Sequence, residues 1–184
     1  MLAVDLFKQK EYENSASLNN KAIIKFQETL HIDSTHRVAR SALGHSYYLV
    51  RQFDKSISWF EEANRIDGEA AVNFRELGLS RINLGQVPEG YRDLQKAFEL
   101  DKSQEIRSIT TDDLYDIGKL AFDYGDGYIK QGEIEKGKQY KLFSIDVLRM
   151  AFDINNKRKD IAHTIGNFAE KMGDKVTAEA YRKE

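Results

Sequence analysis

The chain has 184 residues, and its 28 lysines and arginines nearly balance its 30 aspartates and glutamates, so the formal net charge is −2 with neutral histidines. Residues 1–100 carry 13 basic and 14 acidic side chains, and the other residues carry 15 and 16, so neither half is basic. This balance argues against a protein that holds nucleic acid mainly through phosphate contacts. The absence of cysteine excludes disulfides, thiolate catalysis and cysteine-ligated metal sites.

The apolar residues also bear on where the protein resides. No run approaches the roughly 20 apolar residues of a membrane span, so we expect no direct membrane insertion. Residues 1–5 include Asp5, an acidic residue where a secretory signal needs an apolar stretch. The sequence therefore predicts a cytoplasmic protein. The alternative is a periplasmic or exported protein whose signal peptide has already been removed.

The scarcity of proline favours helices throughout the chain. There is one proline among 184 residues, and proline is the strongest breaker of helices. Apolar residues recur at three-and-four spacing, as in Ile57, Phe60 and Ala63, and nowhere alternate as they do in a half-buried strand. We therefore predict an all-α fold.

The sequence contains an internal repeat. Leu43-Gly44 returns as Leu77-Gly78, at an interval of 34 in the numbering. The same interval relates six further pairs: Phe53 with Val87, Ser56 with Gly90, Phe60 with Leu94, Ala63 with Ala97, Ile66 with Leu100, and Asp67 with Asp101. Small residues in such a pattern let two helices approach closely, while large ones fill the space between them.

On these residues the chain resembles the tetratricopeptide repeat family. The unit of that family is a 34-residue helix–turn–helix with Leu-Gly and then Tyr in its first helix, as in Leu43, Gly44 and Tyr47 here. The resemblance implies a right-handed α-solenoid of about four to five stacked antiparallel helical hairpins. It covers most of the chain and is strongest over 37–101.

The predicted elements begin with a degenerate first repeat over 1–33, because Lys10 falls where the second repeat has Gly44. We expect a first helix that ends in a turn near residues 6–12, followed by one long helix over 12–32. The second repeat spans 37–70 and the third spans 71–104. Within the third repeat, Gly85 is expected to end the first helix and Pro88 to lie in the first turn of the second.

The later elements follow from a second match. Residues 132–137 resemble 85–90 at an interval of 47, which implies a 13-residue insertion, 105–117, before a fourth repeat over 118–155. Thr111 or Asp112 is expected as the N-cap of a helix that starts in this insertion. A C-terminal capping hairpin over 158–184, with its turn at Gly173-Asp174, completes a single array over 1–184.

No pattern of residues indicates catalysis, a metal or a cofactor. His31 and His36 are five apart, unlike the i, i+4 pair of a helical zinc site. The segment from Asp123 superficially resembles a calcium loop, but glycines occupy its third and fifth ligand positions. We therefore expect a protein that is not an enzyme and that binds no cofactor and no metal.

The resemblance implies a binding groove on the concave face, lined by the second, fifth, ninth, twelfth and thirteenth residues of each unit. Carried over to this sequence, these positions are Val38, Ser41, His45, Tyr48, Leu49, Val72, Arg75, Leu79, Ile82, Asn83, Lys119, Phe122, Asp126, Ile129 and Lys130. Many are apolar, and contiguous exposed apolar surface usually marks an interaction site. The alternative is that neighbouring repeats or the C-terminal helices bury these side chains.

These considerations predict a non-enzymatic adaptor that binds an amphipathic helix or an extended apolar peptide of a protein partner in the groove, with Tyr48, Leu79 and Ile82 as a continuous apolar strip. Members of the family that bind acidic chaperone tails use Lys and Asn at positions that here are Ser41 and His45, so that role is not expected. Two alternatives are a self-assembling scaffold, in other words a homo-oligomer, and a regulatory segment of a larger enzyme or sensor.

Trp59, beside Phe60, is expected to pack between repeats, towards the convex side or the following repeat.

Overall fold

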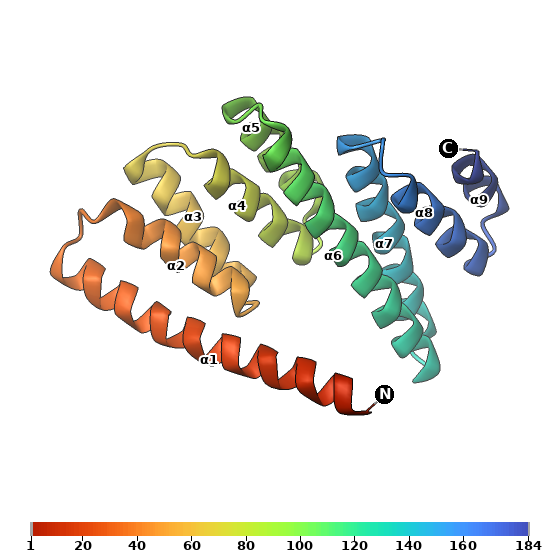
Figure 1. The fold of residues 1–184 in the computed structure, drawn as a ribbon, viewed down its shortest axis with the longest axis horizontal. Coiled ribbons are helices and arrows are strands. Elements are labelled where there is room, and N and C mark those ends of the chain that lie inside the picture. The colour runs from red at the N-terminus through yellow and green to blue at the C-terminus, as the bar shows by residue number, and fades with distance from the viewer. Residues whose placement is uncertain (1, 184) are drawn as a thin grey trace. The chain divides into compact units, whose positions relative to one another are not determined.

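The computed structural model describes the backbone of residues 2–183 and the side chains of residues 14–183. Over that range every regular element is an α-helix, so the predicted all-α fold is confirmed (Figure 1). The helices are α1 (Leu2–Ile32), α2 (Arg37–Leu49), α3 (Phe53–Asp67), α4 (Ala71–Asn83), α5 (Val87–Leu100), α6 (Gln104–Lys130), α7 (Ile134–Ile154), α8 (Lys159–Lys171) and α9 (Lys175–Arg182).

The helices form two compact units, Met1–Leu100 and Asp101–Glu184. In the first unit each helix from α1 to α5 packs against the next one in the chain, and α2 also contacts α4. In the second unit α6 packs along α7, α7 against α8, and α8 against α9. Each unit is thus built from antiparallel helical hairpins in chain order.

The third and fourth hairpins cross in the same way. A Cβ atom on Gly78 would lie 2.7 Å from the carbonyl oxygen of Gly90, and one on Gly125 would lie 2.8 Å from that of Gly137. The two pairs are related by the interval of 47 found in the sequence. Only glycine permits backbones to approach so closely, so the two hairpins share one crossing geometry.

The tight turns between paired helices reuse one backbone conformation. Gly85, Gly132 and Gly173 have φ angles of 79°, 88° and 80° and follow α4, α6 and α8, as predicted for Gly85. Arg51 occupies the corresponding place after α2, one repeat before Gly85, with a φ of 60°. Side chains other than glycine rarely adopt this conformation, so Arg51 is strained.

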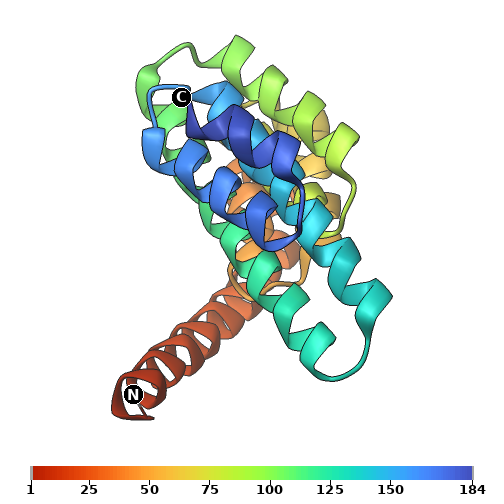
Figure 2. The same cartoon turned by 90° about the vertical axis from the view of Figure 1, so that its right-hand side faces the viewer.

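The N-terminal helix differs from the prediction. We expected a turn near residues 6–12, but α1 runs without interruption over Leu2–Ile32 (Figure 2). The physical reason lies in composition: residues 1–32 contain neither glycine nor proline, so the glycine turn that closes the α4–α5, α6–α7 and α8–α9 hairpins has no counterpart there.

The insertion also differs from the prediction. Residues 105–117 do not contain a helix start but form part of α6, whose N-cap is Ser103, with its hydroxyl oxygen accepting from the Ile106 amide at 3.4 Å. Thr111 is buried inside the helix, and its hydroxyl donates to the Arg107 carbonyl at 2.8 Å. Since no glycine or proline lies in 105–117, nothing interrupts the helix.

Trp59 of α3 is half-buried and packs between repeats as expected, but in another direction. It contacts a cluster of three buried side chains, Ile23 from α1 and Leu43 and Tyr47 from α2. The expectation that Trp59 faces the following repeat is therefore wrong. It packs instead on the two preceding helices, α1 and α2.

Candidate functional site

The predicted groove positions of the first unit lie on two helices that contact each other, α2 and α4. Val38 at the start of α2 is 69% exposed, and Val72, its counterpart in the next repeat, is 55% exposed. Leu49 at the end of α2 is 40% exposed, while Ser41 and Tyr48 are half-buried. Apolar side chains therefore remain in solvent along this pair of helices.

Two of the predicted anchors are not exposed. Leu79 and Ile82 have 0% exposed surface, so the expected strip of Tyr48, Leu79 and Ile82 does not exist on the surface. The reason is that α4 packs against three helices, α2, α3 and α5. Ile82, for example, approaches Gly90 of α5 so closely that a Cβ there would lie 2.6 Å from its Cγ1.

A hydrogen bond between His45 and Glu76 joins α2 and α4 within the same surface. The Nδ1 atom of His45 lies 2.8 Å from Oε2 of Glu76, whose side chain is 8% exposed, and Nη1 of Arg75 lies 3.8 Å from Oε1 of Glu76. The hydrogen bond to Glu76 raises the pKa of His45 above its ordinary value, against an opposing effect of burial. His45, at the ninth position of the second repeat, therefore contacts α4 through Glu76.

We call the surface formed by these residues the α2–α4 face. It consists of the predicted positions that retain exposed area in the first unit, together with the partner of His45: Val38, Ser41, His45, Tyr48, Leu49, Val72, Arg75, Glu76 and Asn83. It combines an apolar margin with polar and charged groups near its middle, a composition suited to a protein segment.

In the second unit, α8 covers part of the predicted groove. Phe122 of α6 is 1% exposed, and its ring stacks on Phe168 of α8 with 3.8 Å between centroids. The expectation that Phe122 lines an open groove is therefore wrong. At this position α8, one of the chain's own C-terminal helices, packs on the side chain, in agreement with the alternative prediction.

The other predicted positions of α6 are more open. Asp126 is half-buried and pairs with Nζ of Lys141 from α7 at 2.5 Å, and Ile129 is half-buried. Lys119 and Lys130 retain exposed surface. These residues do not form an apolar surface comparable with the α2–α4 face.

Sequence reasoning missed the contacts made by the tyrosine position of each repeat. In the second, third and fourth repeats this position lies near the residue 12 places later. In the second repeat Tyr47 belongs to the cluster on which Trp59 packs, and in the third Arg81 pairs with Asp93. In the fourth, the ring centroids of Tyr128 and Tyr140 are 5.1 Å apart. The shared spacing of 12 was visible in the sequence and could have identified these pairs.

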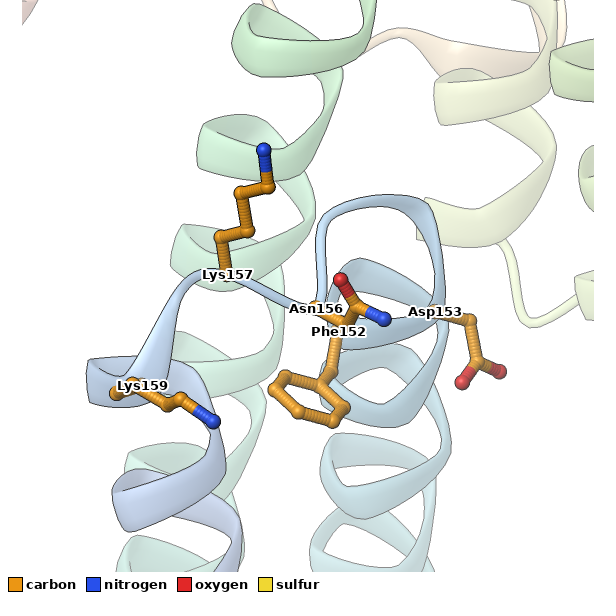
Figure 3. A pocket seen from close by; sticks show the side chains of 5 residues that line it. All are labelled: Phe152, Asp153, Asn156, Lys157 and Lys159. Carbon is orange, nitrogen blue, oxygen red and sulfur yellow. The ribbon is translucent and has the colours of Figure 1, made fainter. Parts of the chain in front are cut away.

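A pocket of about 470 Å³ lies in the second unit, where α7 connects to α8. Its lining combines one aromatic ring with polar and charged groups: Phe152, Asp153, Asn156, Lys157 and Lys159. Figure 3 shows the Phe152 ring below the connecting loop, with Lys157 and Asp153 pointing away from each other.

Among the described side chains, no three histidine, aspartate or glutamate residues come together as metal ligands. Within the described helices, none has the length and apolar character needed to cross a bilayer.

Known proteins resemble this chain in fold. No protein-family model matches it, and no curated protein does. The crystal structure of MamA aligns with a TM-score of 0.54 and 19% identity, over 90% of this chain and 85% of that one. A monomeric IFIT1 mutant solved with m7Gppp-AAAA aligns with a TM-score of 0.42 and 14% identity, over 89% of this chain and 45% of that one. The similarity to MamA shows a tetratricopeptide-like helical-repeat fold.

Proposed function

We propose that this chain is a non-enzymatic interaction module that binds a helix or an extended peptide of a partner protein on the α2–α4 face. The observation that carries the proposal is the exposure of Val38 and Val72 at the same position of consecutive repeats. Burying an apolar side chain is favourable, so such residues in register on adjacent helices offer anchor points for a ligand.

The polar groups of the face can orient the ligand. Arg75 lies next to the His45–Glu76 pair, and its side chain is 12% exposed, so its exposed edge can contact a carbonyl or carboxylate of a bound segment while the guanidinium keeps its contact with Glu76. The distance along α2 from Val38 to Leu49 is about 16 Å at the helical rise of 1.5 Å per residue. About three turns of a partner helix would match that length.

The test uses charge at the exposed valines. Val38→Glu and Val72→Glu place a carboxylate where an apolar anchor would dock, and neither side chain is part of the core. Val176→Glu, on α9 in the second unit and 82% exposed, is the matched control. We expect proteins captured from native lysate by the wild type and by Val176→Glu to be lost from Val38→Glu and Val72→Glu, with binding weakened by about 2 kcal/mol for an identified partner.

Circular dichroism should show the same helix content for all four proteins. If both Val38→Glu and Val72→Glu retain the captured partner as Val176→Glu does, the α2–α4 face is not the binding surface.

A further inference from the structure

The N-terminal helix α1 packs on α2 in the same register as α3 packs on α4. Nε2 of Gln27 donates to the hydroxyl of Tyr47 at 3.1 Å. One repeat later in the sequence, Glu61 of α3 pairs with Arg81 of α4. Because both members of the contact shift by one repeat length, α1 is structurally the second helix of a hairpin.

The other side of α3 shows what such a second helix normally contacts. Ser56 and Phe60 are 0% and 1% exposed, and both contact Gly44 of α2. The Ser56 hydroxyl also lies 3.0 Å from the Ser80 hydroxyl of α4. The hydroxyl of Ser56 donates to the carbonyl of Gly44 at 2.9 Å, and the Phe60 ring lies against Gly44. The ammonium group of Lys55 lies 5.3 Å from the centroid of the Tyr47 ring. Helix α3 therefore contacts two features of α2: a glycine and, three residues later, a tyrosine.

The corresponding side of α1 has matching residues but is not fully covered. Lys21, Ala22, Phe26 and Thr29 correspond to Lys55, Ser56, Phe60 and Ala63 at the interval of 34. Ala22, Phe26 and Thr29 are all half-buried, whereas their counterparts on α3 are 0–1% exposed. We call this surface, formed by these four residues of α1, the α1 slot.

We propose that the α1 slot binds an amphipathic helix of a partner protein that carries a Gly-x-x-Tyr pattern. The occupant is specified by the contact between α2 and α3. A Cβ atom at Gly44 would lie 2.8 Å from the Phe60 ring, so the residue opposite Phe26 must be glycine. A tyrosine three residues later on the partner helix would place its ring beneath the ammonium group of Lys21. Tyr47 and Lys55 make this contact between α2 and α3.

The slot is continuous with an existing interface, which favours a helix over an extended peptide. Phe26 contributes to the slot and also packs on the cluster of Ile23, Leu43 and Tyr47 that joins α1 to α2. A helix placed beside α1 would add its apolar side chains to this cluster, just as α2 and α3 pack their apolar side chains together. Such docking follows the usual mode in which an apolar helix face fills a groove between or beside helices.

The experiment measures binding of a defined probe to the full chain. The probe is a fluorescent peptide with the sequence of residues 36–52, which contains Gly44 and Tyr47. We expect saturable binding by fluorescence anisotropy, weakened about tenfold or more when the peptide carries Gly44→Leu, since the leucine overpacks a close contact. This comparison alters only the peptide, so the folding of the protein cannot explain it.

Two protein variants locate the site. Ala22→Glu adds a charge inside the slot, and Ile24→Glu adds the same charge at a 54% exposed position of α1 outside the slot. Only Ala22→Glu should weaken binding. Equal binding of the two peptides, or equal binding by the two protein variants, would overturn the proposal.

Two further measurements separate the alternatives. If sedimentation shows a dimer that Ala22→Glu converts to a monomer, a second copy of the chain occupies the slot and the partner-helix proposal is wrong. Val38→Glu should bind the peptide as the wild type does. This variant therefore distinguishes failure of the α1 slot from failure of the α2–α4 face.

Discussion

At the scale of single residues, Arg51 shows how one side chain departs from the pattern of its neighbours. Its φ of 60° is close to the positive values that the other hairpin turns give to Gly85, Gly132 and Gly173. The backbone hydrogen bond that follows, from the Gln52 amide to the Tyr47 carbonyl at 2.9 Å, fixes this geometry. Strain at Arg51 is thus imposed by the turn.

Replacing Arg51 should therefore stabilise the protein. We expect Arg51→Gly to raise the free energy of unfolding by about 1 kcal/mol, because glycine adopts the left-handed conformation without steric cost. Urea denaturation measures the change. Arg51→Ala is the control, since alanine removes the side chain but keeps the strain. A glycine variant no more stable than the alanine variant would contradict this explanation.

His45 links the stability of the α2–α4 contact to pH. The hydrogen bond to Glu76 raises the pKa of His45 above 6.5, with Arg75 nearby acting in the opposite direction. A raised pKa in the folded state means that the folded protein binds the proton more tightly. The stabilisation is therefore complete below about pH 6.5 and is lost as pH rises through the folded-state pKa.

We expect the melting temperature of the wild type to fall between pH 6 and pH 8 by more than that of His45→Gln, which keeps a polar side chain but cannot titrate. Differential scanning calorimetry across this range tests the difference. The effect should be modest, because half of the His45 side chain is exposed to solvent. Parallel pH profiles for the two proteins would show that the pair does not contribute.

At the scale of elements, glycines in one helix have opposite roles. Gly125 and Gly127 both lie in α6. A Cβ on Gly125 would lie 2.8 Å from the Gly137 carbonyl oxygen of α7, whereas a Cβ on Gly127 would meet nothing within 4 Å. The first glycine allows the helices to cross, and the second only lowers the helical propensity of α6.

Alanine substitutions should therefore change stability in opposite directions. Gly127→Ala should raise the free energy of unfolding by about 1 kcal/mol through helix propensity. Gly125→Ala should lower it by about 1–3 kcal/mol, because α6 and α7 must separate to admit the methyl group. Chemical denaturation of both variants and of the wild type measures these changes in the free energy of unfolding. A stabilising effect at both positions would mean that the helices do not cross closely at Gly125.

At the scale of the whole molecule, the division into two compact units determines which helices a destabilising substitution affects. Contacts in repeat proteins are mainly between neighbouring elements, so a local defect should weaken the adjacent helices most. Gly44 lies against the Phe60 ring, and its replacement by leucine would force α2 and α3 apart in the first unit.

Hydrogen exchange should show this pattern. In Gly44→Leu we expect amide exchange to rise most in α2 and α3, next in α1 and α4, and least in α8 and α9. Mass spectrometry of peptic fragments provides the measurement, with Gly127→Ala as a variant that leaves α2 and α3 unchanged. Equal acceleration in α3 and α9 would show that the chain unfolds as a single cooperative unit.

The sequence alone determined the helical class and much of the register. The intervals of 34 and 47 predicted that Gly78 and Gly125 occupy equivalent positions, and both lie at close crossings. Gly85 was likewise predicted to end a helix, and it does so with a φ of 79°. These features depend on residues near in sequence or repeated at a fixed interval, which is why a single sequence reveals them.

Only the tertiary structure decided which apolar residues reach solvent. Leu79 and Val72 occupy predicted groove positions of the same helix, yet Leu79 is 0% exposed and Val72 is 55% exposed. Phe122 is covered by Phe168, which belongs to a helix much later in the chain. Helical periodicity marks a side chain as apolar but does not specify what covers it, because burial depends on helices that are distant in sequence and meet only when the chain folds.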